Sequence, residues 1–162
     1  MLNRRQILAT LAGVAVASRT GAAADSYNGP VPPKKDVPYL LHADNLVETE
    51  VVNASESSQK KDVTFSVPGT TSPAKTPLAE PIFLFASDRI SPDSLSLYQF
   101  EVKNGRREIK IPRSKGGVKV FHTSLRALAP GLFRIEAAEY LENGEYSLSP
   151  EGQNITFCFT VF

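Results

Sequence analysis

The sequence is poor in the residues that most often carry chemistry or crosslinks. It has one cysteine, Cys158, two histidines, His42 and His122, and no tryptophan. A single cysteine excludes an intrachain disulfide. The sequence also lacks a Gly-x-Ser-x-Gly elbow, a glycine-rich phosphate loop, a His-Glu-x-x-His motif and paired-cysteine spacing. The common signatures of hydrolases, nucleotide-binding proteins and zinc proteins are therefore missing.

The chain also lacks a strong excess of either charge. Its formal net charge is +1 over 162 residues, and without residues 1–24 it keeps 15 basic and 17 acidic residues. Such a chain has no long-range attraction to nucleic acid or to anionic lipid, so we expect no nucleic-acid partner. One local basic stripe stands out, and we interpret it as a solvated face, with binding of an anionic polymer as the alternative. It comprises Arg106, Arg107, Lys110, Arg113, Lys115 and Lys119.

Residues 1–24 have the order of a cleavable signal peptide: a basic start, an apolar stretch and then small residues. The apolar stretch, Ile7–Ala17, is shorter than the roughly 20 residues that span a bilayer, so we expect no membrane span in the mature protein. Ala22 and Ala24 suit the pocket of a signal peptidase, which predicts cleavage before Asp25, with Ala15-Val16-Ala17 as a second candidate site. We expect an exported protein, in the periplasm or outside the cell.

The run Asn-Arg-Arg-Gln-Ile-Leu at 3–8 resembles a twin-arginine export signal of bacteria. Arg4 and Arg5 are followed by one spacer and two large apolar residues, and Arg19 lies before the cleavage site. The lysine of the fuller pattern is replaced by Ala9. The resemblance implies export in the folded state. An ordinary general-secretion signal that happens to contain two arginines is the alternative.

From residue 37 onward the apolar residues recur with a period of two, which indicates strands with one buried face. The run Pro81–Ala86 is apolar throughout and predicts a strand covered on both sides. We predict one domain over residues 37–162, an all-β, antiparallel, immunoglobulin-like sandwich of about seven to nine strands. A proline-rich tether, residues 25–36, precedes it. The alternating series are 63–67, 109–111, 133–137, 146–148 and 155–161.

Turn residues separate these runs. Asn104-Gly105 and Asn143-Gly144 are dipeptides typical of tight β-hairpin turns, because both accept positive φ. The apolar phase changes between Leu97 and Tyr98, which predicts a β-bulge there. The segments 132–136 and 141–148 resemble the closing half of immunoglobulin-like sandwiches in exported bacterial proteins, a resemblance that implies fold and no activity.

Two long stretches, Asn53–Asp62 and Pro68–Glu80, show no apolar period and are expected to be loops. Long loops in a small domain often carry function. We therefore take the second as a candidate binding surface, with a plain solvated connection as the alternative. Its candidate residues are Thr70, Thr71, Lys75 and Thr76.

Few residues are candidates for catalysis. His42 and Asp44 are two apart on an expected strand and would share a face, and His122 is the third polar group of a conceivable hydrolase or metal site. Cys158 lies in an apolar run, which favours a buried, inert thiol. We expect no cofactor and no metal. The sequence favours an exported, non-enzymatic envelope protein that binds a protein or glycan. The alternatives are an assembly component that adds a strand to a neighbour, and a small periplasmic enzyme.

Overall fold

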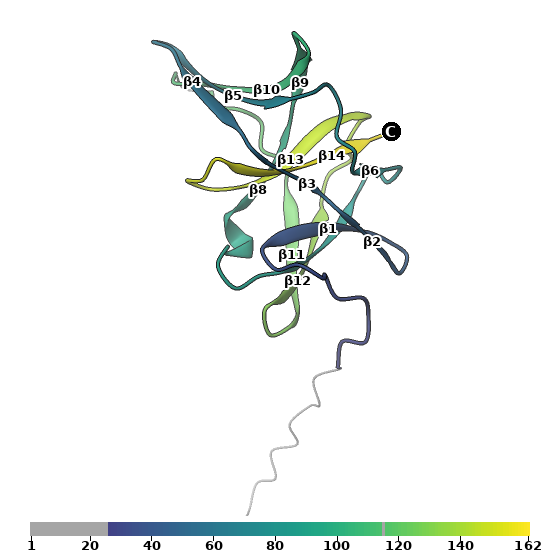
Figure 1. The fold of residues 1–162 in the computed structure, drawn as a ribbon. Coiled ribbons are helices and arrows are strands. Elements are labelled where there is room, and N and C mark those ends of the chain that lie inside the picture. Colours follow the sequence, from purple (N-terminus) through teal and green to yellow (C-terminus); the bar gives the residue numbers. More distant parts are fainter. Residues whose placement is uncertain (1–25, 115) are drawn as a thin grey trace, which may run out of the picture.

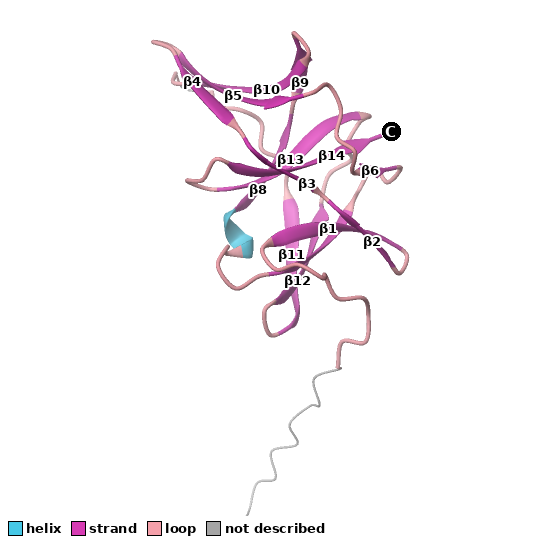
Figure 2. Ribbon diagram, in the orientation of Figure 1, coloured by secondary structure: helices cyan, strands magenta, loops and turns pink. Residues whose placement is uncertain are grey.

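The computed structural model describes residues 26–114 and 116–162, and this part of the chain is almost entirely β-structure (Figures 1 and 2). The predicted all-β, sandwich-like architecture is confirmed. In the described residues the strands number fourteen, more than the seven to nine expected, and they form three sheets. One 3-10 turn, Pro92–Ser94, precedes β8. The predicted signal peptide, with Arg4, Arg5, Ala22 and Ala24, lies outside the described residues.

The three sheets differ in their strand order. Sheet A has the order β11-β12-β7-β1-β2, with β1 Val37–His42, β2 Asn45–Glu48, β7 Ile82–Ala86, β11 Thr123–Ala129 and β12 Leu132–Ala137. Sheet B has the order β3-β14-β13-β8, with β3 Glu50–Asn53, β8 Leu95–Gln99, β13 Gly144–Pro150 and β14 Ile155–Val161, and the short β6, Lys75–Thr76, pairs in parallel with β14. Sheet C has the order β4-β5-β10-β9, with β4 Ser55–Ser58, β5 Asp62–Pro68, β9 Glu101–Lys103 and β10 Arg106–Pro112.

Sheet B is the middle layer, with sheet A on one side and sheet C on the other (Figure 1). The larger core fills the space between sheets A and B. Phe83 of sheet A and Phe159 of sheet B meet edge to face with ring centroids 5.0 Å apart, and Tyr146 stacks on Phe159 at 5.7 Å. Residues at alternate positions of β13 and β14 supply this core, as the period of two predicted. Its sheet B members include Leu97, Tyr146, Leu148, Phe157, Phe159 and Val161.

A second, smaller core lies between sheets B and C. It contains Cys158 and Phe100 on one side and Val67 and Ile109 of sheet C on the other. The intervening positions of β14, Thr156, Cys158 and Thr160, are therefore buried as well. An alternating strand was expected to face water on its polar side, and here that side is covered by another sheet.

Some segments pass from one sheet to the next without a loop, which explains the larger number of strands. The segment Asn45–Ser58 provides β2, β3 and β4, with breaks at Thr49 and Ala54. Likewise β8 continues into β9 through Phe100. The predicted bulge between Leu97 and Tyr98 is wrong, because β8 pairs with β13 without a register shift. Both faces of β8 carry apolar residues instead: Leu95 and Leu97 face sheet A, while Tyr98 and the following Phe100 face sheet C.

The other local predictions have mixed outcomes. β7 lies between β12 and β1 and is buried on both faces, as predicted. Asn104 and Gly105 turn the β9–β10 hairpin with φ values of 52° and 74°, as predicted for this dipeptide. The turn predicted at Asn143-Gly144 is not a hairpin, because β12 belongs to sheet A and β13 to sheet B. No helix among the described residues has the length and apolar character that a bilayer crossing requires.

The segment expected to be a tether is described from Ser26 onward and is bonded to the domain near its end. Pro32 and Asp36 are buried. The Asp36 carboxylate accepts hydrogen bonds from the backbone N–H groups of Arg89 and Ile90 at 3.0 and 3.1 Å and lies 2.8 Å from the hydroxyl of Ser87. Asp36 thereby joins the N-terminal segment to the loop that follows β7.

Candidate functional site

The 68–80 segment, expected to be a loop without a period, is extended and half buried. Ser72, Ala74 and Thr76 are buried, while Lys75 and Thr71 are exposed. Ala74 O accepts from Thr160 N at 2.8 Å, and Thr76 O accepts from Phe162 N at 3.1 Å. The segment therefore runs along β14 with alternate side chains turned inward. The hydropathy of the sequence does not show this alternation, because the inward residues are small or polar.

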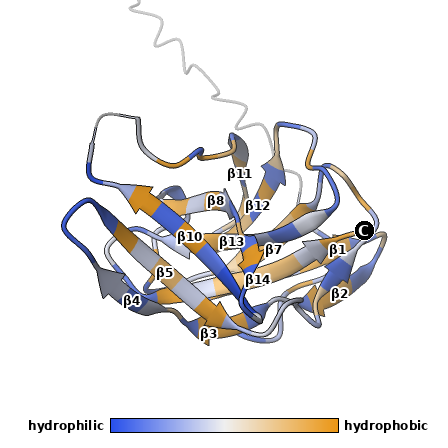
Figure 3. Cartoon of the chain, turned by 90° about the horizontal axis from the view of Figure 1, so that it is seen from above, coloured by the Kyte–Doolittle hydropathy of each residue, from blue (hydrophilic) through white to orange (hydrophobic). Residues whose placement is uncertain are grey.

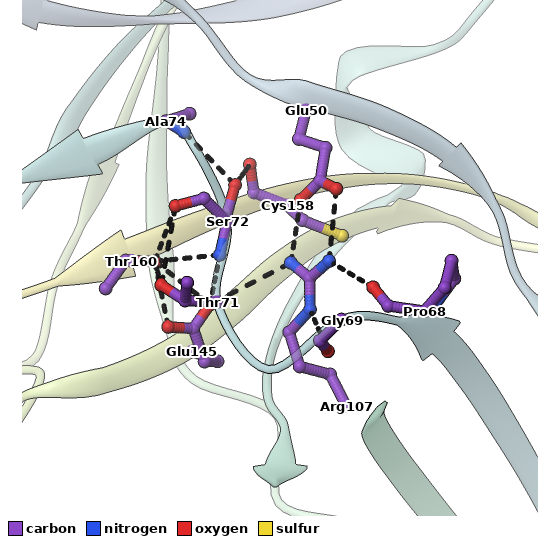
Figure 4. A network of polar contacts seen from close by, with 10 residues as sticks. All are labelled: Glu50, Pro68, Gly69, Thr71, Ser72, Ala74, Arg107, Glu145, Cys158 and Thr160. Atoms are coloured by element: carbon purple, nitrogen blue, oxygen red, sulfur yellow. Dashed lines mark hydrogen bonds and ion pairs between the residues drawn. The ribbon is translucent and has the colours of Figure 1, made fainter. Parts of the chain in front are cut away.

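A buried polar network fastens this segment to the junction of sheets B and C (Figure 4). Arg107 of β10 is fully buried. Its guanidinium donates to Glu50 at 2.7 and 3.1 Å and to the carbonyl oxygens of Pro68 and Gly69 at 2.8 and 3.2 Å. Glu145 lies 3.8 Å from the same guanidinium. The buried guanidinium of Arg107 therefore connects β3, the start of the 68–80 segment and β13.

The second half of the network is centred on Glu145. Its carboxylate accepts from the Thr160 hydroxyl at 2.9 Å and from the Ser72 backbone N–H at 2.9 Å. Ser72 Oγ donates to Cys158 O at 3.2 Å. Among the described residues no buried side-chain polar atom lacks a partner. A network this fully satisfied specifies a fixed arrangement and leaves no group free to bind a ligand.

Cys158 lies against this network and is fully buried. Burial raises the pKa of its thiol to about 12, although the nearby Arg107 acts in the opposite direction. A thiol with such a pKa stays protonated at neutral pH and is a poor nucleophile. The expectation of a buried, inert cysteine agrees with this position.

Beyond the second core, sheets B and C separate and leave a cavity of about 190 Å³, here called the BC groove. One wall is the inner face of sheet C, where Phe65 pairs with Ile109 and the next inward residue of β10 is Ile111. The other wall is sheet B with the tip of the β13–β14 hairpin, residues 149–156. The apolar lining residues are Phe65, Tyr98, Phe100, Ile109, Ile111 and Ile155.

Sheet C is amphipathic in a way that explains the groove. Apolar and polar residues alternate along β5 and along the second half of β10, as the hydropathy colours of the ribbon show (Figure 3). The polar set, which includes Thr64, Ser66, Glu108 and Lys110, faces away from sheet B because it occupies the positions between the inward ones. Since sheet C meets sheet B only at one end, the apolar face at the other end stays partly open.

The groove also borders an open sheet edge. β4 is the outermost strand of sheet C, and all four of its residues are exposed. By alternation, Glu56 of β4 faces the same side as Phe65, its partner in β5. Ala54, which immediately precedes β4, lines the groove.

The predicted catalytic candidates do not form one site. Asp44 lies in the two-residue turn between β1 and β2, so the prediction that it shares a strand face with His42 is wrong. His42 Nε2 lies 2.9 Å from Thr76 Oγ1. His122 lies just before β11 and is paired with Glu139 at 2.7 Å. β1 and β11 are separated by β7 and β12, about 14 Å between strand axes.

The same lack of clustering holds for metal ligands. No group of three His, Cys, Asp or Glu side chains in residues 26–114 and 116–162 is arranged to hold a metal ion.

His122 has a side chain that is 84% exposed, and its acidic partner Glu139 also binds Lys119 at 3.3 Å. Hydrogen bonds from His122 outweigh the small effect of burial and lower the pKa of Glu139 to about 2.

The basic stripe is dispersed by the fold. Arg107 is buried in the network, and Lys110 pairs with Asp62 at 2.8 Å. Arg106 lies 3.5 Å from Glu108, and Arg113 bonds to Ser58. Lys115 lies outside the described residues. The expectation of a solvated face holds for the exposed members, and the buried Arg107 is a structural residue that sequence reasoning missed.

Comparisons with known proteins find no matching family model, no matching curated protein and no matching solved structure. The resemblances to a twin-arginine signal and to immunoglobulin-like sandwiches of exported bacterial proteins therefore stay predictions.

Proposed function

We propose that this protein is an exported, non-enzymatic binding protein of the bacterial cell envelope, and that the BC groove receives an apolar side chain of a partner protein. The groove is the observation that carries the proposal. Six large apolar side chains line a space between two sheets, and four of them, Phe65, Tyr98, Ile111 and Ile155, are partly exposed to solvent. Such a space is the usual form of a binding site.

The size of the groove indicates what it holds. A cavity of about 150 Å³ lined by aliphatic and aromatic side chains binds benzene, and the BC groove measures about 190 Å³. It therefore accommodates one aromatic ring or one large aliphatic side chain, and a bulky cofactor is too large. A sugar ring suits it less well, because its hydroxyl groups would lose water against an apolar lining without gaining hydrogen bonds.

The positions of the polar candidates support a role without catalysis. The one thiol is buried and protonated. His42 on β1 bonds to Thr76, and His122, just before β11, bonds to Glu139, so the two histidines lie apart and have different partners. Export is supported by the sequence of residues 1–24 alone. The 68–80 segment, the original candidate surface, contributes Thr70 and Lys75 as exposed groups, while its inward residues are occupied by structural contacts.

Peptide display tests the proposal. A random library of twelve-residue peptides is panned on the purified protein, and enriched peptides are measured against an Ile111→Glu variant, which places a charge in the groove. The matched control is Thr64→Glu, on the opposite face of the same sheet. We expect an enriched aromatic or large aliphatic residue and a loss of affinity of at least tenfold in Ile111→Glu only. The proposal would be refuted if the enriched peptides bound both variants equally. It would also be refuted if the protein bound glycans on an array and no peptide.

A further inference from the structure

The edge of sheet C beside the groove is built to accept another strand. We propose that the partner is an extended polypeptide that pairs with β4 as a fifth strand of sheet C and places its apolar side chain in the BC groove. This inference rests on the proposed function and names the form in which the partner binds. Addition of a strand to an exposed edge, with side-chain pockets beside it, is a recurring mode of peptide recognition.

The first support is the backbone of β4. Gln59 N donates to Asp62 O at 2.8 Å at the end of the β4–β5 hairpin. Hydrogen-bonded and non-bonded pairs alternate along an antiparallel ladder. The pairs Glu56–Phe65 and Ser58–Val63 are therefore the non-bonded ones, and the backbone groups of Glu56 and Ser58 point away from β5. Among the described strands, none pairs with β4 on that side.

The second support is that this edge has no lysine, proline or bulge, and its one charged residue is Glu56. Natural sheets shield their edges with lysine, proline or bulges. β4 reads Ser-Glu-Ser-Ser, and its register with β5 has no shift. The opposite edge of the sheet, β9, is three residues long and ends in Lys103. Within sheet C, β4 is accordingly the edge that is open to pairing.

The third support is the charge and position of Glu56. Its side chain is exposed on the inner side of β4, next to Phe65 of the groove wall. A strand added to β4 would place one side chain directly opposite Glu56, and opposite charges at such a position attract each other. On the added strand, the side chains two positions before and after the residue opposite Glu56 point to the same face. They lie opposite Ala54 and Ser58. The partner therefore carries a basic residue two positions from its apolar residue.

Substitution of Ser58 tests the backbone pairing. Ser58→Pro removes the outward N–H, and proline is tolerated where that group faces solvent. Ser58→Ala loses the same side-chain contact with Arg113 and keeps the N–H, so it is the matched control. For the peptides enriched on the wild-type protein, we expect about tenfold weaker binding to Ser58→Pro and an unchanged affinity for Ser58→Ala. Circular dichroism establishes that both variants are folded.

Charge reversal gives a test that does not depend on proline. Glu56→Lys is expected to weaken the selected peptides about fivefold, and Glu101→Lys on the opposite edge is expected to leave them unchanged. If peptides lose affinity in Ile111→Glu but bind all β4 variants equally, strand addition is wrong and the proposed function stands. If no peptide depends on Ile111, both fail. If β4 variants change only self-association of the protein, the partner is a second copy and the inference is overturned.

Discussion

Arg107 and Glu50 face each other across the junction of sheets B and C with two parallel hydrogen bonds. Nη1 lies 2.7 Å from Oε2, and Nη2 lies 3.1 Å from Oε1. Planar two-pronged pairing of this kind is available to arginine and not to lysine. Because Arg107 also donates to two carbonyl oxygens of the 68–80 segment, this one pair joins β3, β10 and that segment.

Removal of the Arg107 charge is expected to be costly. Arg107→Met leaves Glu50 and the buried Glu145 without their cation, and loss of one partner of a buried pair costs about 3–5 kcal/mol. Arg106→Met, its exposed neighbour, should change the free energy of unfolding by less than about 0.5 kcal/mol. Urea unfolding of the two variants measures the difference. Similar stabilities would contradict the structural role given to Arg107.

The fold should lose stability in acid partly through Asp36. Burial alone would raise the pKa of its carboxyl, but hydrogen bonds from Arg89, Ser87 and Ile90 together hold that pKa well below its usual range. A carboxyl with a lowered pKa in the folded state stabilises above its unfolded value of about 3.9, and this contribution is lost as the pH falls below that value.

Asp36→Asn tests that pH dependence. We expect the variant to be less stable than the wild type at pH 7 by about 2 kcal/mol, from loss of charge-assisted hydrogen bonds. The difference should shrink as the pH falls from about 5 toward 2. Denaturant unfolding across this range measures it, with the exposed Asp93→Asn as control. A difference between wild type and Asp36→Asn that is independent of pH would argue against the contacts of Asp36.

Cys158 should react only when the protein opens. Its thiol is fully buried and its pKa is raised to about 12, so little thiolate exists and none is accessible. We expect Ellman's reagent at pH 8 to modify the native protein at least roughly a hundredfold more slowly than the protein unfolded in guanidinium chloride. Rapid modification of the native protein would show that the second core is open.

Gly105 should resist substitution for a reason of backbone conformation alone. It has a φ of 74°, and a Cβ added there would meet no atom within 4 Å. Gly105→Ala is therefore expected to cost about 1–2 kcal/mol through left-handed strain without any steric clash. Gly105→Asn should cost less, because asparagine tolerates this region. Thermal unfolding of both variants checks the order, and equal stability of Gly105→Ala and wild type would contradict the turn geometry.

The sequence predicted the strands and the larger core because those features depend on local alternation. Phe157, Phe159 and Val161 alternate with smaller residues, and their shared face is buried against sheet A. The Asn104-Gly105 turn was predicted because two adjacent residues determine it. In each case the physical cause lies within a few residues of chain.

The third sheet could not be predicted in the same way. The inner face of sheet C packs on Cys158, and Thr156 and Thr160, which are buried on the same face of β14, are residue types typical of a solvent-facing side. Their burial depends on Arg107 and Glu145 meeting from positions distant in the sequence. The BC groove was missed for the same reason, since it arises where two sheets separate and no single segment encodes it.

The segment Asn45–Ser58 belongs to all three sheets in turn. A sheet that shares a continuous chain segment with the next sheet cannot be excised as an autonomous fragment. It also cannot unfold without disrupting the strands of its neighbours. Heat or denaturant should therefore unfold the described layers in one cooperative transition, and a single proteolytic cut near Thr49 or Ala54 would uncouple them.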